Sequence, residues 1–371
     1  MSNPRFLFVK FSEEEILLEQ GRLLFSLLSA FSSAGYQISL FDNLPADKLG
    51  KYAQPVFSLK NLTLSNSLPK DTPNWTCLFD REDSALKKYS WYKKIKVRYD
   101  VFSPYWFRKP VIMPFPLHPL HNTPDLDNQL QRHRLAKKNM KIFFSGDTQG
   151  YSKNHIHYPK AKLPRLLIID TILERMADNV LLVSKTSELT SLREASYIDK
   201  CVIVDTNNIW VDSQHWLGDL ARADFFLSPP GIVMPMCHNL VEAMAVGTVP
   251  ITNYPEWFDP ALRHMEDCIV FDDSNDLLVK LRQAMEMDEA QLKNIRKNAL
   301  NYYETHLQPQ IFIKNIESRR AGTTHLLMFT ERNVARNFSK LNRNSIVIFG
   351  TTSIGEKEWI KNIPQRLLSR Q

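Results

Sequence analysis

The chain has 371 residues, 43% of them hydrophobic, which suits two globular domains and excludes an intrinsically disordered chain. No stretch approaches the roughly 18 apolar residues of a membrane-spanning helix. The formal net charge of +7 comes without a recognised nucleic-acid-binding motif, so we expect no nucleic-acid partner.

The first residues and the cysteines bear on the cellular compartment. The apolar run Phe6–Val9 is shorter than the hydrophobic region of a secretory signal. The four cysteines are scattered without a C-x-x-C pair, which predicts buried free thiols and argues against a disulfide framework or a zinc site. We therefore expect a cytoplasmic protein, free or held peripherally at the inner face of a membrane.

Strands alternate with helical segments in the first part of the chain, and this pattern predicts a Rossmann-like domain over residues 1–121. The candidate strands are Phe6–Val9, Gln37–Phe41, Cys77–Phe79, Lys96–Phe102 and Pro110–Met113, and the first long helix is Glu15–Ser33.

Residues 122–139 are polar and charged, and we expect them to link this domain to a second α/β domain over residues 140–318. Its candidate strands are Ile142–Phe144, Val180–Val183, Cys201–Val204, Phe225–Leu227 and Cys268–Phe271, and its candidate helices are Arg165–Met176, Ser213–Ala221 and two segments across Asn275–Thr305. The predicted fold class is α/β, with two Rossmann-like domains.

The most informative segment of the second domain is Phe225–Ile251. An apolar run suited to a buried parallel strand ends at Ser228-Pro-Pro-Gly231, and a short helix follows before Gly247, which occupies a helix C-cap position. In a doubly wound sheet such a loop lies at the carboxyl ends of the strands, where ligands bind. The helix N-terminus then offers unpaired N–H groups to an anion, and Glu242 can accept hydrogen bonds from sugar hydroxyls.

This segment resembles the C-terminal half of GT-B glycosyltransferases, most closely the exostosin-like group and more distantly the large retaining family with a glutamate in the same helix. Lys109–Pro116 resembles the strand that ends the N-terminal domain of that group, and Lys141–Gly146 with Arg165 resembles the start of the second domain. The resemblance covers residues 109–310. It implies two Rossmann-like domains that face a cleft, with a C-terminal helix, for which Gln310–Ser318 is the candidate, returning to the first domain.

The resemblance also implies a donor site for a nucleotide sugar. Its candidate residues are Gly146, Lys153, Arg165, Ser228, Gly231, His238, Asn239 and Glu242. Glu242 would meet the ribose or the donor sugar, while Lys153 and Arg165 would neutralise the pyrophosphate leaving group. Related enzymes often carry a basic residue where Asn239 stands. In this chain, His238 or a residue elsewhere would therefore contact the diphosphate of the donor.

Three of these residues have a structural alternative. Glu242 could instead be an exposed residue on the surface of a helix. His238 could be a hydrogen-bonded histidine of the core, beside its apolar neighbours, and Gly231 could simply allow a turn.

An inverting reaction would need a carboxylate from the first domain to deprotonate the acceptor hydroxyl. Asp80 and Glu82 follow the strand Cys77–Phe79 and are the catalytic candidates, with Asp83 and the Glu13–Glu15 run placed similarly. Each is equally compatible with a solvated loop acid or a helix N-cap.

We expect no obligatory metal and no other cofactor. His155 and His157 form an H-x-H pair, but no third ligand follows at a recognisable spacing. Asp125-Leu-Asp127 matches the D-x-D of metal-dependent transferases, yet it stands in a polar segment rather than after a buried strand.

Residues 319–371 extend beyond the GT-B plan and form a basic C-terminal extension with ten Lys and Arg against three Glu, an excess of 7. Leu326–Phe329 and Ser345–Phe349 are candidate strands. Such a basic surface suits an anionic membrane face or an anionic acceptor, and a solvated basic face is the alternative.

The sequence therefore predicts a metal-independent glycosyltransferase that moves a sugar from a nucleotide sugar to a glycan or lipid-linked saccharide, in surface polysaccharide synthesis. Two alternatives stay open: a non-catalytic glycan-binding or assembly subunit on the same scaffold, and a nucleotide-sugar epimerase.

Overall fold

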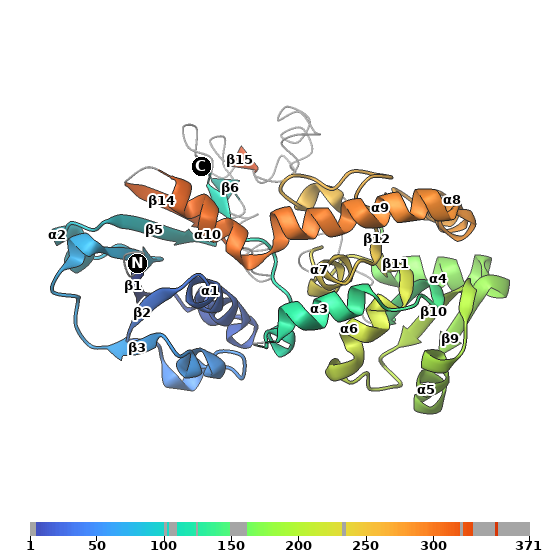
Figure 1. Cartoon of the computed structure of the whole chain (residues 1–371), viewed down its shortest axis with the longest axis horizontal. Coiled ribbons are helices and arrows are strands. Elements are labelled where there is room, and N and C mark those ends of the chain that lie inside the picture. The colour runs from blue at the N-terminus through green and yellow to red at the C-terminus, as the bar shows by residue number, and fades with distance from the viewer. Residues whose placement is uncertain are drawn as a thin grey trace, which may run out of the picture. The chain divides into compact units, whose positions relative to one another are not determined.

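The computed structural model describes residues 5–99, 102–103, 110–123, 125–148, 162–231, 235–319, 322–328 and 346–347. These residues form two compact units (Figure 1). Unit 1 contains the described residues up to Pro119 and those from Gln308 onward, and unit 2 spans Leu120–Leu307. Each unit has its own sheet and its own helices.

Unit 1 is built on a seven-stranded sheet in which all pairings are parallel. Its strands are β1 (Arg5–Lys10), β2 (Tyr36–Phe41), β3 (Leu62–Ser65), β4 (Trp75–Phe79), β5 (Lys93–Arg98), β7 (Val111–Ile112) and β14 (Thr323–Leu327). Their order is β3-β2-β1-β4-β5-β14-β7. The first five follow the 3-2-1-4-5 order of a Rossmann sheet, and β14 takes the sixth place.

The α-helices described in unit 1 are α1 (Arg22–Ser33), α2 (Ser84–Lys88) and α10 (Pro309–Ser318). Short 3₁₀ turns lie at Glu14–Leu17, Glu19–Gly21, Ala46–Lys48, Gln54–Ser58 and Thr72–Asn74, and β6 (Phe102–Ser103) pairs antiparallel with β15 (Ile346–Val347). A strand was expected over Ser345–Phe349, and β15 lies within that range.

The helix α10 packs into the core of unit 1, although the whole of unit 2 separates it in sequence from the earlier part of that unit. The rings of Phe31 on α1 and Phe312 on α10 meet edge to face at 6.3 Å between centroids, and Phe312 and Ile316 are buried. Lys93 at the start of β5 donates to the carbonyl oxygens of Ile316 and Arg319 at the end of α10, at 2.7 and 2.8 Å. The expected return of a C-terminal helix to the first domain is confirmed.

The position of β14 corrects the expectation of a separate extension over residues 319–371. β14 lies between β5 and β7, with Leu326 and Leu327 fully buried. Residues 322–328 therefore complete the core of unit 1. The sequence pattern could not show this pairing, because it joins segments that lie on either side of unit 2 in the chain.

Unit 2 is a second doubly wound sheet with parallel pairing throughout. Its strands are β8 (Met140–Gly146), β9 (Val180–Val183), β10 (Tyr197–Asp205), β11 (Ala223–Ser228), β12 (Val249–Thr252) and β13 (Ile269–Val270), in the order β13-β12-β11-β8-β10-β9. Its described helices are α3 (Leu126–Arg134), α4 (Arg165–Arg175), α5 (Thr186–Glu194), α6 (Ser213–Ala221), α7 (His238–Ala245), α8 (Ser274–Glu286) and α9 (Glu289–Tyr302). Short turns complete it at Pro119–His121, Ala177–Asn179, Pro255–Trp257 and Tyr303–Leu307.

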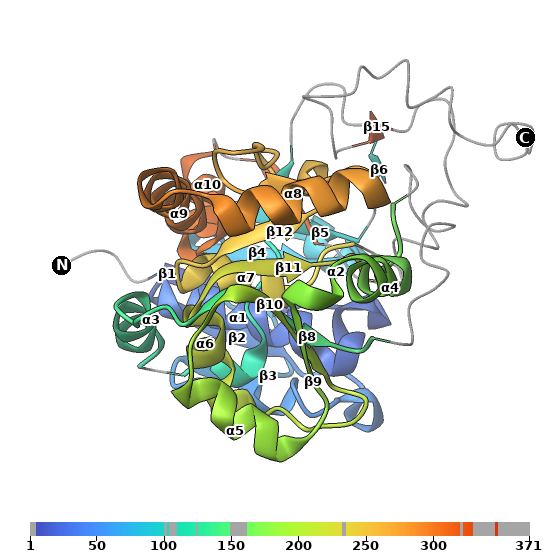
Figure 2. The ribbon, with the colours of Figure 1, turned by 90° about the vertical axis from the view of Figure 1, so that its right-hand side faces the viewer.

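Helices cover both faces of this sheet, with α8 on one side and α5 and α6 on the other (Figure 2). Along β8, Ile142 and Phe144 join the apolar cluster of α4 and α8, while the ring of Phe143 faces Trp216 of α6. Apolar side chains therefore point to both faces, as expected of a buried parallel strand.

The predicted linker over residues 122–139 is replaced in the structure by α3, whose Leu130 is buried and which packs against α6. Apart from Leu126 and Leu130, the residues of this helix are polar or charged, so its sequence carries no apolar stripe by which a helix could be recognised. The division between the units falls instead at Pro119 and Leu120.

The α/β class with two Rossmann-like sheets is confirmed. All four cysteines are free, with three buried and Cys237 half-buried. Among the described residues, no helix is long and apolar enough to cross a membrane.

Candidate functional site at the carboxyl edge of unit 2

The winding of unit 2 reverses at β8, which pairs with β10 on one side and with β11 on the other. In an open α/β sheet, ligands bind outside the carboxyl ends of the strands at such a switch point. Here β8 ends at Gly146 and β11 ends at Ser228, and both residues were predicted to belong to a donor site.

The segment Phe225–Ile251 folds as the sequence predicted, into strand, loop, short helix, glycine turn and strand. α7 begins at His238, after an extended Cys237 whose side chain makes no cap hydrogen bond to the helix. Gly247 follows the helix with φ of +76°, a conformation that glycine adopts without steric cost. The N-terminus of α7 thus follows directly on the loop at the switch point.

Gly146 and Arg165 lie close together at this edge. A Cβ atom at Gly146 would lie 3.1 Å from the ring of Phe144 and 3.7 Å from Nη1 of Arg165, the first residue of α4. A side chain at position 146 would therefore crowd the ring of Phe144 and lie in van der Waals contact with the guanidinium group.

The thiol of Cys237 lies within the electrostatic reach of Arg165. Burial raises the pKa of Cys237, and the positive charge of Arg165 acts in the opposite direction. Arg165 thus brings a cation to the residue that precedes α7.

Ser228 is buried and its hydroxyl pairs with the hydroxyl of Tyr254 at 2.6 Å. Burial raises the pKa of Tyr254 well above its usual value. This pair joins the ends of β11 and β12 beneath the loop. The sequence interpretation missed Tyr254, because nothing in the local pattern relates it to a serine at the end of a different strand.

A second polar network joins the ends of β8 and β10. The buried carboxylate of Asp205 accepts hydrogen bonds from Thr148 Oγ1 at 2.9 Å, from the side chain of Asn207 at 2.8 Å and from that of Asn208 at 2.7 Å. These contacts fix the beginning of the loop that follows Gly146. The sequence interpretation did not single out any of these four residues.

Lys153 lies outside the described residues, as do His155 and His157. The described lysine nearest in sequence is Lys162, which is buried and donates to the carbonyl oxygen of Asn253 at 2.5 Å. Its ammonium group also lies 2.5 Å from a carboxylate oxygen of Glu256. Lys162 therefore holds the loop after β12 in place.

Glu242 is fully buried, whereas the sequence predicted a carboxylate open to a ligand. Trp216 Nε1 on α6 donates to Glu242 Oε2 at 2.6 Å, and His121 Nε2 lies 3.8 Å from Oε1. Burial lowers the pKa of His121 to about 4. These partners come from α6 and from the turn before α3, which is why the helical pattern alone could not reveal them.

The other predicted donor residues lie at the beginning of α7 and in the loop before it. His238 and Asn239 are the first two residues of α7 and are half-buried. The amide of Gly231 donates to the carbonyl oxygen of Pro235 at 3.2 Å. Their contact with a donor stays a prediction.

In unit 1, Asp80 follows β4 and is buried. Its carboxylate accepts hydrogen bonds from the backbone amides of Ser12, Glu13 and Arg81, at 2.8, 2.9 and 2.6 Å. Burial raises the pKa of Asp80, and these hydrogen bonds oppose that rise. The contacts favour a structural role, in which Asp80 fixes the loop after β1.

The neighbouring acids also have partners. Glu82 forms an ion pair with Lys94 at 2.7 Å. Asp83 pairs with Lys10 at 2.5 Å and caps α2 by accepting from the amide of Leu86. The catalytic roles of Asp80 and Glu82 stay predictions.

The described residues contain no group of three or more His, Cys, Asp or Glu side chains suited to hold a metal ion. Asp125 precedes α3 and is paired with Arg132 at 2.8 Å.

No family model and no curated protein matches the chain. Among solved structures, it is similar to a glycosyltransferase from Rickettsia africae, with 10% identity, a TM-score of 0.48 and coverage of 85% of this chain and 98% of the other. HepE from Anabaena in complex with UDP has 11% identity and a TM-score of 0.42, over 84% and 98% of the two chains. Sucrose-phosphate synthase from Thermosynechococcus elongatus has 12% identity and a TM-score of 0.40, over 84% and 97%. The two Rossmann-like sheets follow from their strand orders.

Proposed function

We propose that the chain is a GT-B glycosyltransferase that binds a nucleotide-sugar donor at the carboxyl edge of unit 2. The observation that carries the proposal is the segment 225–251. Its sequence resembles the donor-binding segment of GT-B enzymes, and its loop and helix lie at the switch point of a doubly wound sheet. The return of α10 to unit 1 is consistent with the same plan.

In this proposal the diphosphate of the donor lies between the N-terminus of α7 and Arg165. The first turn of a helix presents N–H groups and a partial positive charge to an anion. The guanidinium group of Arg165 adds a full charge where negative charge develops on the leaving group. These groups stabilise the pyrophosphate without an obligatory metal, so transfer should survive chelation by EDTA.

We assign Glu242 a positioning role in place of the predicted contact with the sugar. Its carboxylate is anchored to Trp216, so it ties α7 to α6 and fixes the direction in which the helix N-terminus points. Gly146, Ser228, Gly231, His238 and Asn239 stay as proposed donor-binding positions around that N-terminus.

The acceptor is proposed to be a glycan or lipid-linked saccharide of a surface polysaccharide. The support is the basic excess of residues 319–371, since positive charge favours an anionic acceptor or an anionic membrane face. Residues 322–328 are needed for the sheet of unit 1, so we assign the contact with the anionic acceptor or membrane to residues 329–371. These residues include eight Lys and Arg against three Glu, an excess of 5 positive charges.

A second candidate function is a non-catalytic glycan-binding or assembly subunit on the same scaffold. The observation that favours it is the engagement of Asp80, Glu82 and Asp83 by backbone amides or lysines of unit 1. A nucleotide-sugar epimerase, the other alternative, gains no support from the described residues.

Hydrolysis and transfer assays with a panel of UDP-, GDP- and CMP-sugars test the proposal. Removal of one preorganised hydrogen-bond donor from an active site typically lowers turnover by about 10²- to 10³-fold. We expect a loss of this order for Arg165→Gln. Arg175→Gln, at the other end of α4, is the matched control, because Arg175 pairs with Asn275 at the surface. Binding of a donor without turnover would favour the non-catalytic subunit, and equal turnover of both variants would remove Arg165 from the site.

A further inference from the structure

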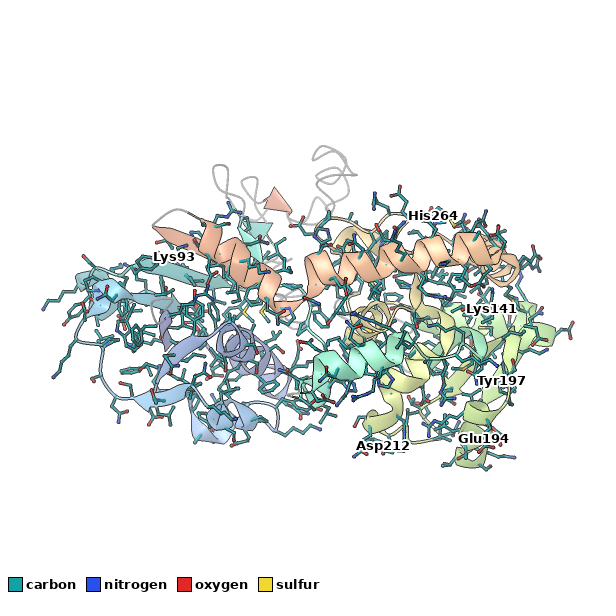
Figure 3. The ribbon with its side chains drawn as sticks, viewed as in Figure 1. Lys93, Lys141, Glu194, Tyr197, Asp212 and His264 are labelled. Carbon is teal, nitrogen blue, oxygen red and sulfur yellow. The ribbon has the colours of Figure 1, made fainter. Side chains whose placement is uncertain are left out.

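A cavity lies at the amino-terminal edge of the unit 2 sheet, opposite the proposed donor site. Its volume is about 350 Å³, and its lining comes from the segment before β8, the beginnings of β8, β10 and β11, and α9. The lining residues are Lys138, Lys141, Ile198, Asp224, Glu289 and Arg296. In Figure 3, Lys141 and Tyr197 mark this edge, where Tyr197 of β10 pairs with Met140 of β8 before the register shifts.

Basic side chains outnumber acidic ones in the lining of this cavity. Lys141 Nζ lies 3.6 Å from Asp224 Oδ2, and Arg296 Nη2 lies 2.6 Å from Asp224 Oδ1. Lys138 Nζ approaches a hydroxyl, Thr248 Oγ1, at 3.4 Å. Lys141 and Arg296 thus share one buried carboxylate, Lys138 adds a third basic group that is only partly protonated near pH 7, and the exposed Glu289 lies at the rim.

The basic side chains of this cavity have little access to bulk water. The side chain of Lys141 is 10% exposed, and Nε of Arg296 is buried with no hydrogen-bond partner among the described residues. Burial together with the charge of Arg296 lowers the pKa of Lys138 to about 7. A buried hydrogen-bond donor that lacks a partner is unfavourable unless an acceptor is supplied, and two basic side chains here share a single carboxylate.

We propose that this cavity binds a small molecule through a phosphate group. Three basic side chains suit the charge and the several acceptor oxygens of a phosphate, whose charge would favour the protonated form of Lys138. The volume lies at the lower end of the range of small-molecule sites, about 300 to 1,000 Å³, and leaves room for a small polar body beside the anion. Because the site lies at the opposite edge of the sheet, it is separate from the proposed donor site and does not depend on it.

Thermal unfolding of the full chain in inorganic phosphate, against chloride of equal ionic strength, tests the proposal. We expect phosphate to raise the unfolding temperature, and Lys141→Gln to weaken the apparent phosphate affinity at least tenfold. Lys137→Gln, which removes an exposed neighbouring lysine, is the control and should behave as wild type. Lys141→Arg keeps the charge and should retain binding even if Lys141→Gln folds poorly.

Acetylation of the wild-type protein by acetic anhydride at pH 7 gives an independent readout, measured for each lysine by peptide mass spectrometry. Lys138 should react readily, since its pKa of about 7 leaves much of the amine neutral. Bound phosphate would raise that pKa and slow acetylation of Lys138 several-fold, while Lys137 stays unchanged. Glucose 1-phosphate that protects Lys138 at lower concentration than inorganic phosphate would identify a sugar phosphate as the ligand, and the reverse order would identify free phosphate.

Two results would overturn the proposal. One is equal stability and equal acetylation in phosphate and in chloride. The other is a phosphate effect that is abolished by UDP and retained in Lys141→Gln, because such an effect would arise at the carboxyl edge.

Discussion

The carboxylate of Glu242 is buried beside the indole of Trp216, and burial of an ionisable group is costly unless it is hydrogen-bonded. Glu242→Ala removes the acceptor and leaves the Trp216 N–H unpaired. Hydrogen bonds to charged groups contribute about 1.5 to 3 kcal/mol, so we expect a loss of about 2 to 4 kcal/mol in the free energy of unfolding.

Urea unfolding followed by circular dichroism measures this loss. Glu242→Gln keeps an oxygen acceptor for the indole and should lose clearly less than Glu242→Ala. An unchanged unfolding midpoint in Glu242→Ala would mean that the carboxylate is solvated in solution and would return it to the list of ligand contacts.

His121 gives unit 2 a pH dependence whose sign follows from burial. Its pKa is lowered from 6.5 to about 4 in the folded protein, so the unfolded chain binds the proton first as pH falls. The contribution to stability is therefore full above pH 6.5 and is lost as pH falls toward 4. In His121→Gln, stability should fall less over this window, and a wild-type-minus-variant difference that stays constant with pH would contradict the assignment.

At the scale of elements, Lys93 fastens α10 to unit 1. Its ammonium group is buried and donates to three carbonyl oxygens at the end of that helix, and Figure 3 places it beside α10. Lys93→Met should lower the stability of unit 1 by about 2 to 3 kcal/mol, since the hydrogen bonds involve a charged donor. Lys96→Met, on the same strand but half-buried, is the control. Equal losses of stability in the two variants would show that strand β5 tolerates no methionine. The hydrogen bonds from Lys93 to the end of α10 would then not be responsible for the loss.

Helices and strands could be predicted where the residues that indicate them are near neighbours in the chain. The segment from β11 to β12 was predicted in full, because an apolar run, a Pro-Pro-Gly loop and Gly247 are signals between near neighbours in the chain. α3 was missed because its sequence is almost entirely polar. α5 was missed because Thr186–Glu194 is weakly amphipathic, with Leu189 and Leu192 as its buried residues.

The candidate site was less predictable than the fold. The sequence placed Gly146, Arg165 and Ser228 at strand or helix ends, where the structure also has them. It could not show that Glu242 faces Trp216 or that Asp80 binds the loop after β1, because both contacts join segments far apart in the chain.

At the scale of the whole molecule, the C-terminal part of the chain is needed for unit 1. Truncation after Ser318 removes β14 from between β5 and β7, together with the buried Leu326 and Leu327. We expect that chain to lose the cooperative unfolding transition of unit 1. Truncation after Met328 keeps β14 and should retain the transition.

The second truncation also tests the proposed surface contact, because it removes residues with an excess of 5 positive charges. Attraction to an anionic membrane is worth about 1 kcal/mol per basic residue near the surface. Binding to phosphatidylserine vesicles should weaken in the chain that ends at Met328, and equal binding of the truncated and full-length chains would contradict a membrane role for residues 329–371.

The central claim is that the carboxyl edge of unit 2 binds a nucleotide sugar. Its most direct test is the unfolding free energy of the chain with UDP, GDP, CMP and their sugars. A ligand at 100 times its dissociation constant should add about 2.7 kcal/mol, and the gain should shrink in Arg165→Gln while Arg175→Gln keeps it. No stabilisation by any member of the panel, or an equal gain in Arg165→Gln, would contradict the claim.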